Sequence, residues 1–171
     1  MDNLKQFIRE VPDFPKAGIV YYDITTLLQN SQALRMTIDQ FVWLFSNLHV
    51  DKVVGIESRG FMFGSIVAYN LNAGFVPVRK PGKLPAHTIG EEYELEYGTD
   101  TLEMHSDGVE QGDRVLIVDD LIAIGGTALA ATKLVESAGG KVAGLGFVVE
   151  LTFLEGRKRL QGYSVESLIK Y

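Results

Sequence analysis

The sequence predicts an α/β fold with an open, mainly parallel twisted sheet flanked by helices. Four aliphatic runs carry this prediction because they lack polar alternation, as strands buried on both faces of a sheet do: 52–56, 75–78, 115–118 and 142–149. Segments with helical spacing separate the runs. An alternation of strand and helix gives parallel strands joined by right-handed crossovers.

Composition bounds the class of protein. The 171 residues fit a single domain, 1–171, that is long enough to bury a sizeable core. A hydrophobic fraction of 46% with 22% charged residues is typical of a folded globular chain. The formal net charge of −6 argues against a general nucleic-acid binder, and the absence of cysteine excludes a disulfide framework or a thiol site.

The first residues predict a short amphipathic helix. Leu4, Phe7, Ile8 and Val11 have helical spacing, and Pro12 ends the pattern. The segment lacks the uninterrupted apolar core of a signal peptide, and no apolar run approaches the roughly 20 residues that span a bilayer. We therefore expect a cytoplasmic protein without a membrane anchor.

Residues 12–28 are not periodic. Phe14, Ile19, Tyr21 and Tyr22 lie there among turn-forming residues. An apolar, aromatic and irregular segment suits a lid over a flat ligand, although core packing is the commoner role of such aromatics.

The next helix and strand lead to an arginine. Ser31 is expected to cap a helix with one apolar face, and the strand 52–56 is followed by a helix that begins near Gly60. Arg59 thus lies at the carboxyl end of a strand, where ligands bind in open α/β sheets. Its guanidinium suits phosphate oxygens, whereas the alternative is a surface ion pair with Glu57.

A basic loop and an acidic ribbon follow the strand 75–78. Arg79, Lys80 and Lys83 cluster beside Pro and Gly in an otherwise acidic chain, which suits a loop attracted to a multiply charged phosphate. The alternation from Tyr93 to Thr101 predicts a flexible hairpin that could close over a site. Four glutamates lie in this hairpin or just before it, and residue chemistry alone does not rank them: Glu91, Glu92, Glu94 and Glu96.

The stretch from Val115 to Ala131 is the best candidate site. The strand 115–118 is expected to end at Asp119 and Asp120, before a small-residue loop and a helix over 128–137. The loop, formed by Ala123, Ile124, Gly125, Gly126 and Thr127, places a close backbone and free helix amides where a phosphate can bind. A sugar phosphate also explains the two acids, because ribose hydroxyls would donate to them, with or without Mg²⁺. A plain strand and capped helix is the alternative.

The remaining elements complete the sheet. Gly139 and Gly140 are expected to end the helix over 128–137. A short helix over 157–160 and an edge strand over 165–169 are expected after the strand 142–149.

The segment VLIVDDLIAIGGT resembles the phosphoribosyl pyrophosphate (PRPP) motif of type I phosphoribosyltransferases. Ile124 stands where that family usually has Thr, so a side-chain hydroxyl is missing. Residues 14–25 resemble the hood of adenine phosphoribosyltransferases, with Tyr22 in place of a common Arg. The segments IESRGF, FVPVRKPGKLP and LEYG also match that family, so the resemblance spans nearly the whole chain.

The resemblance implies roles that spacing does not give. Arg59, Arg79, Lys80 and Lys83 would hold pyrophosphate, while Asp119, Asp120 and residues 123–127 would hold the ribose phosphate. Val20, Tyr21 and Leu151 would bind the base, with Tyr21 and Leu151 on its two faces. Glu96 would be catalytic.

The resemblance also implies an activity. Adenine and PRPP would give AMP and pyrophosphate, with Mg²⁺ held mainly by PRPP or pyrophosphate and water, in a homodimer with a hood from about 12–28 and the C-terminal segment. Two alternatives stay open: a phosphoribosyltransferase for another base, and an inactive PRPP-sensing regulator on the same fold.

Overall fold

The computed structural model describes residues 4–94 and 98–171, so Glu96 lies outside the described residues. A five-stranded sheet forms its centre, in the order β4-β3-β7-β8-β9, and all four strand pairs are parallel. These strands are β3 (Lys52–Ile56), β4 (Gly74–Val78), β7 (Arg114–Ile122), β8 (Lys141–Glu150) and β9 (Val165–Lys170). The predicted parallel sheet is confirmed, with β9 as its predicted edge strand.

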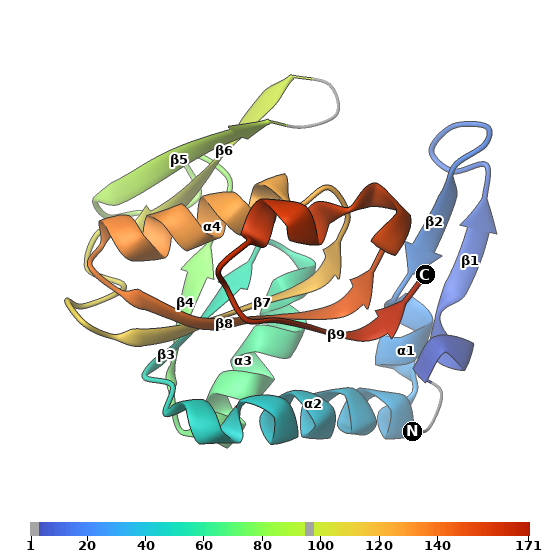
Figure 1. Cartoon of the computed structure of the whole chain (residues 1–171), viewed down its shortest axis with the longest axis horizontal. Coiled ribbons are helices and arrows are strands. Elements are labelled where there is room, and N and C mark those ends of the chain that lie inside the picture. The colour runs from blue at the N-terminus through green and yellow to red at the C-terminus, as the bar shows by residue number, and fades with distance from the viewer. Residues whose placement is uncertain (1–3, 95–97) are drawn as a thin grey trace.

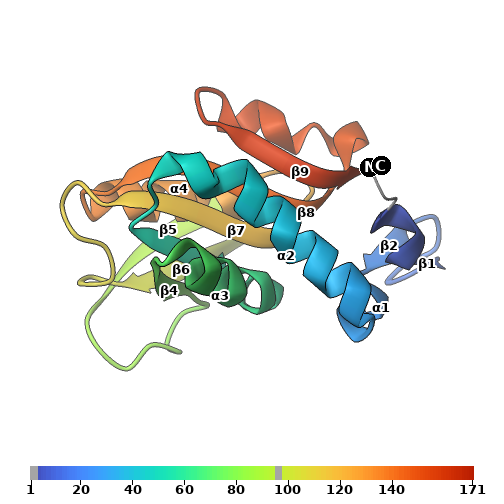
Figure 2. The ribbon, with the colours of Figure 1, turned by 90° about the horizontal axis from the view of Figure 1, so that it is seen from below.

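Helices cover both faces of this sheet (Figures 1 and 2). On one face, α2 (Ser31–Phe45) and α3 (Arg59–Leu71) pack against side chains such as Val53 and Leu116; on the other, α4 (Gly126–Ser137) packs against Val54 and Ile117. Neighbouring strand residues therefore enter different cores, which is why these strands show no polar alternation.

Two helix ends can be compared with the expectations. Asn30, not Ser31, caps α2: its side chain accepts a hydrogen bond from the Ala33 amide at 2.9 Å. Asparagine caps a helix as well as serine does, so the choice between neighbours was open. Gly139 follows α4 with φ +93°, the left-handed conformation that glycine permits, which confirms the predicted end of that helix.

Strand β7 is longer than predicted. Its pairing with β3 ends at Val118, but its pairing with β8 continues from Asp119 to Ile122. The two aspartates thus lie within a strand that has lost one neighbour, not in a loop. This arrangement leaves the side of β7 that faces β3 open at their level.

The expected N-terminal helix is wrong. A single 3₁₀ turn, η1 (Leu4–Phe7), is followed by β1 (Arg9–Pro12), which pairs antiparallel with β2 (Val20–Asp23). An ion pair of 2.6 Å between Arg9 and Asp23 joins the two strands. Pro12 is compatible with this isolated two-stranded ribbon because an edge position needs no amide donor. The short helix α1 (Thr25–Gln29) follows, and the β1–β2 hairpin stands beside the end of β9 (Figure 1).

A second antiparallel ribbon projects over α4 (Figure 1). It consists of β5 (Thr88–Glu94) and β6 (Thr99–His105), which confirms the predicted hairpin. Three further 3₁₀ turns complete the described chain: η2 (Ser46–Leu48), η3 (Thr152–Leu154) and η4 (Gly156–Leu160), the last at the short helix expected near residues 157–160. Of the helices in the described ranges, none has the length and apolarity to cross a membrane.

Candidate active site

A cavity of about 530 Å³ lies at the carboxyl ends of β3 and β7, where open α/β sheets bind ligands. Nine of the predicted residues line it, although they are up to 68 positions apart in the sequence: Arg59, Lys80, Asp119, Asp120, Ala123, Ile124, Gly125, Gly126 and Thr127. The fold therefore brings the arginine, the acids and the glycine loop to one place.

The loop 123–127 is shaped by close backbone contacts. Gly125 has φ +81°, and a Cβ atom added there would lie 2.4 Å from the carbonyl oxygen of Gly156. A Cβ atom on Gly156 would in turn lie 2.1 Å from the carbonyl oxygen of Ala123. The loop thus rests directly on the backbone of η4, and only glycine fits at either contact. It leads into α4, whose first-turn amides have no partner within the helix and are available to bind an anion at the cavity wall.

Asp119 and Asp120 form the acidic wall of the cavity. The Asp120 amide donates to Asp119 Oδ1 at 2.8 Å, and the Asp120 side chain is buried. Burial and repulsion from Asp120 raise the pKa of Asp119 well above its usual range. Burial also raises the pKa of Asp120, although the nearby Arg59 cation opposes that rise. Both acids would gain from hydroxyl or cationic partners in the cavity.

Arg59 reaches these acids from the first turn of α3. Its Nε lies 2.9 Å from Asp120 Oδ2, and its Nη1 donates to the Tyr21 hydroxyl. Asp120 Oδ2 forms this ion pair but accepts no hydrogen bond from the described residues. It is therefore still available as a hydrogen-bond acceptor. The alternative pairing of Arg59 with Glu57 is wrong.

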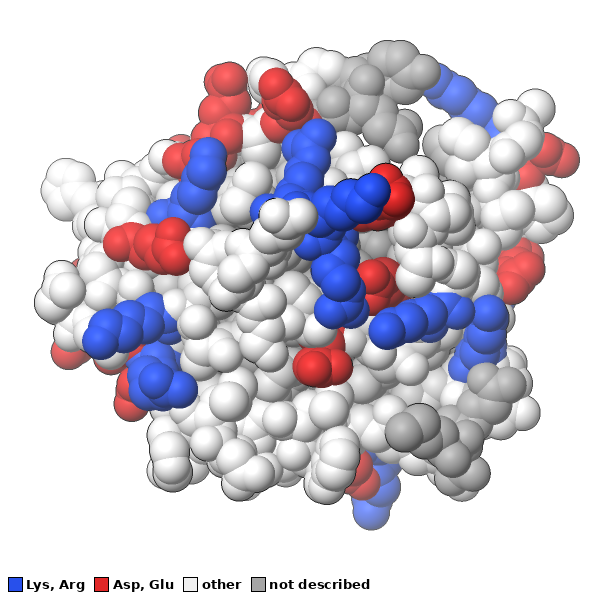
Figure 3. Space-filling model, in the orientation of Figure 1, with Lys and Arg blue, Asp and Glu red and all other residues white. Residues whose placement is uncertain are grey.

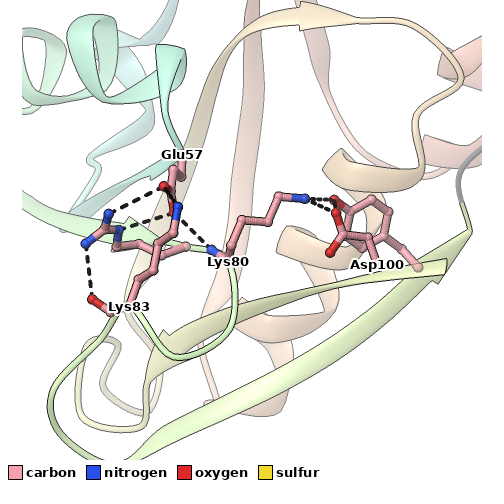
Figure 4. Close-up of polar contacts among 6 residues, drawn as sticks. Glu57, Lys80, Lys83 and Asp100 are labelled. Carbon is pink, nitrogen blue, oxygen red and sulfur yellow. Dashed lines mark hydrogen bonds and ion pairs between the residues drawn. The ribbon is translucent and has the colours of Figure 1, made fainter.

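Glu57 instead anchors the basic loop (Figure 4). Its carboxylate lies 3.3 Å from Arg79 Nε and 2.5 Å from Lys83 Nζ, and it accepts the Lys80 backbone amide at 3.0 Å. Burial alone would raise the pKa of Glu57, but the hydrogen bonds from Lys83, the Lys80 amide and Arg79 lower it to about 2. Glu57 therefore stays ionised and holds the loop beside the cavity.

Lys80 connects the cavity to the β5–β6 ribbon. Its ammonium group donates to the Tyr93 hydroxyl at 2.8 Å and forms an ion pair with Asp100 (Figure 4). Burial would lower the pKa of Lys80, but these two partners raise it, so the lysine is a cation. Arg79 and Lys83 do not line the cavity as Lys80 does. On the face shown in Figure 3, basic side chains gather near the centre with acidic ones between them, in a chain of net charge −6.

The three predicted base-binding residues do not line this cavity. Val20 and Tyr21 lie on β2, where the Tyr21 ring packs edge-on against Phe14 with centroids 5.3 Å apart. Leu151 follows β8 and is buried in the core. The bond from Arg59 to Tyr21 joins the hairpin to the cavity wall.

Sequence reasoning assigned no role in the site to several lining residues, among them the apolar Ile56 and Phe147. Phe147 lies on β8 opposite Asp119 of β7 in the strand register. This neighbour relationship depends on how β7 and β8 pair, which the sequence does not show. The only signal in the sequence was the position of Phe147 within an aliphatic run.

Comparison with known proteins agrees with this geometry. A family model described as the phosphoribosyl transferase domain matches residues 23–168. The chain belongs to the phosphoribosyltransferase family. Within it, the chain is 60% identical over 171 residues to the adenine phosphoribosyltransferase of Solibacter usitatus, covering 100% of this chain and 99% of the relative. It is 56% identical over 170 residues to that of Koribacter versatilis, covering 99% and 93%.

Solved structures of phosphoribosyltransferases match the fold as well. The adenine phosphoribosyltransferase of Thermoanaerobacter pseudethanolicus superposes with a TM-score of 0.96 at 54% identity, covering 99% of both chains. That of Saccharomyces cerevisiae, complexed with an imino-altritol bisphosphate and adenine, gives a TM-score of 0.90 at 40% identity, covering 96% of both. The expected type I phosphoribosyltransferase fold is therefore confirmed.

Proposed function

We infer that this chain is an adenine phosphoribosyltransferase that converts adenine and PRPP to AMP and pyrophosphate in purine salvage. One observation carries the inference: the glycine loop 123–127 and the acids Asp119 and Asp120 share a cavity with Arg59. A phosphate site beside two hydroxyl acceptors suits a ribose phosphate. Full-length similarity to adenine phosphoribosyltransferases supports the choice of base.

The proposed roles follow from charge. Backbone amides of residues 123–127 bind the 5′-phosphate, and the carboxylates of Asp119 and Asp120 accept the ribose hydroxyls. Arg59 and Lys80, with Arg79 and Lys83 in the loop that Glu57 anchors, stabilise the negative charge of the departing pyrophosphate. Fixing both ends of PRPP leaves its reacting carbon facing the base, which replaces a random encounter with a held geometry.

We propose that the β1–β2 hairpin is a hood over the base. Val20 would read the edge of adenine through its backbone, while Tyr21 and Leu151 would pack on its two faces. The contact between Tyr21 and Arg59 supports this role because Arg59 lines the cavity, so the contact holds the hairpin beside it. Glu96 would exchange a proton with the purine; this assignment rests on the family resemblance alone.

Mg²⁺ is the proposed cofactor, and the donor set fits it. The cavity offers the hard carboxylate oxygens of Asp119 and Asp120, which suit this ion. The described residues contain no group of three or more His, Cys, Asp or Glu placed to hold a metal. As the family resemblance implies, PRPP or pyrophosphate oxygens and water would be its main ligands. When bound, the ion would neutralise charge on the pyrophosphate group.

The reaction is tested by incubating the protein with adenine, PRPP and MgCl₂ and measuring AMP and pyrophosphate together. The proposal predicts equal amounts of both products, formed only when all three are present. Pyrophosphate without AMP would indicate hydrolysis of PRPP, and the proposed transfer would then be wrong.

A cytoplasmic homodimer completes the proposal. Met62, Ile66 and Tyr69 are exposed at helical spacing on α3, beside a groove of about 490 Å³ that also contains Arg35 and Asp39 of α2. In a two-fold interface, Arg35 of each copy would face Asp39 of the other. Sedimentation should therefore give a dimer in the wild type and a monomer in Ile66→Asp; a monomeric wild type contradicts the proposal.

A further inference from the structure

The two walls of the proposed base site belong to different sheets. Val20 and Tyr21 lie on β2 of the hairpin, whereas Leu151 follows β8 of the central sheet. Within the described residues, no strand pairing joins these two sheets. Side-chain contacts between the two sheets therefore contribute to the spacing between the walls.

Tyr171 is fixed by its backbone to the Leu151 wall. Its amide donates to the Glu150 carbonyl at 3.0 Å, and its carbonyl accepts from the Thr152 amide at 2.9 Å and from the Thr152 hydroxyl at 2.5 Å. These bonds are made to the residues on either side of Leu151. Tyr171 and Leu151 therefore move together.

The side chain of Tyr171 is held by the hood. Its ring lies 4.0 Å from the ring of Tyr22 on β2, centroid to centroid, at an interplanar angle of 40°. Lys5 Nζ of η1 lies 3.9 Å from the centroid of the Tyr171 ring and donates to the Lys170 carbonyl at 3.2 Å. Tyr171 thus contacts β2 of the hood and the preceding turn η1. Figures 1 and 2 show the end of β9 beside these elements.

Alternation along β2 links this contact to the cavity. Neighbouring residues of a strand point to opposite sides, so Tyr22 faces Tyr171 while Tyr21 faces Arg59. Any movement of Tyr22 away from Tyr171 also moves Tyr21. Leu151, Tyr171, Tyr22 and Tyr21 therefore form a continuous connection from one wall of the base site to the other.

We propose that Tyr171 is a positioning residue that sets the separation between Tyr21 and Leu151 and so determines how well adenine fits. The proposal rests on the proposed function, because it assumes that the base lies between these two side chains. Its ring, held between a cation and a second ring, acts as the spacer; its hydroxyl is buried without a hydrogen-bond partner among the described residues and contributes nothing to the contact.

The first test compares Tyr171→Ala with Tyr171→Phe in the steady-state kinetics of both substrates. Loss of the ring contact should raise KM for adenine about two- to tenfold, the range expected for one aromatic pair, with less than a twofold change in KM for PRPP. Tyr171→Phe should behave as the wild type. Tyr22→Leu, which keeps apolar bulk, should reproduce the effect of Tyr171→Ala, and the double variant should add little to either.

Tyr163→Ala is the matched control. Tyr163 bonds to Glu136 on α4, far from the hood, so its loss should lower stability without a selective change in KM for adenine. If Tyr171→Ala and Tyr22→Leu lower the melting temperature but leave KM for adenine unchanged, Tyr171 is only a stabilising residue and the proposal is wrong.

Hydrogen exchange distinguishes a failure of the proposed role of Tyr171 from a failure of the proposed function. Amides of residues 20–23 should exchange faster in Tyr171→Ala than in the wild type or in Tyr163→Ala, whatever the activity. Absence of AMP formation by the wild type would reject the proposed function alone. Unchanged exchange in Tyr171→Ala would reject the connection between Tyr171 and the hood.

Discussion

Arg59 Nε lies 2.9 Å from Asp120 Oδ2, which joins the first turn of α3 to the carboxyl end of β7 across the cavity. The same guanidinium donates to Tyr21 of the hairpin. One side chain therefore contacts both the ribose side and the base side of the proposed site. It should matter for catalysis and for stability.

Replacing Arg59 by Ala should lower kcat/KM for PRPP by at least about a hundredfold, as expected when a group that stabilises developing charge is lost. It should also lower the free energy of unfolding by about 1–3 kcal/mol, since Asp120 would be buried without its partner. Arg59→Lys should retain part of the activity and part of the stability, because lysine keeps the positive charge but lacks the planar guanidinium group. The exposed Lys158→Ala is the control; equal effects of the two alanine variants would contradict the assigned role.

Alanine substitutions at two glycines distinguish the cost of backbone strain from the cost of a steric clash. Gly125 and Gly162 both have positive φ, but an added Cβ atom meets Gly156 only in Gly125→Ala, and nothing lies within 4 Å of it in Gly162→Ala. Gly162→Ala should cost about 1–2 kcal/mol of unfolding free energy from the left-handed backbone alone. Gly125→Ala should cost more and also weaken PRPP binding measured by calorimetry. Equal PRPP affinity in both variants would show that the loop does not hold the phosphate.

Glu57 should make the free energy of unfolding depend on pH in the acidic range. Its folded pKa is about 2, below the ordinary 4.5, so its ionised form stabilises the fold fully above pH 4.5. That stabilisation should be lost as the pH falls from 4.5 toward 2. In urea unfolding, the difference between the wild type and Glu57→Gln should therefore shrink across this window. A difference that stays constant across this window would contradict the ion-pair assignment.

Glu96→Gln should lower kcat with only a modest change in PRPP affinity, because the proposed role of Glu96 is proton transfer to or from the purine. Glu92→Gln on β5 is the matched control and should retain kcat. The readouts are steady-state AMP formation and calorimetric binding of PRPP. An unchanged kcat in Glu96→Gln would remove Glu96 from this role.

The sequence predicted the central strands β3, β7 and β8 well because they are largely buried and consist mainly of apolar residues. It failed at the N-terminus, where Leu4 and Ile8 are buried as an amphipathic helix would require, yet lie in and after a single 3₁₀ turn before β1. Four apolar positions cannot distinguish these structures, and the pairing of β1 with β2 decided the outcome.

Nine of the residues predicted for the site line the cavity, but the partners of these residues could not be predicted. Local patterns marked Arg59, the two aspartates and the basic loop. The pairing of Glu57 with Arg79, rather than with Arg59, depends on β3 and β4 ending side by side. Likewise, the contact between Tyr21 and Arg59 spans 38 positions and requires the hairpin to be placed over the sheet.

The most direct test of the central claim compares bases in one assay. Pyrophosphate release from PRPP and Mg²⁺ is measured with adenine, hypoxanthine, guanine or xanthine supplied separately. The account predicts release with adenine and little with the other three bases. Release with another base would keep the PRPP site but contradict the assignment of the hood to adenine, and PRPP binding without release for any base would indicate a regulator instead of an enzyme.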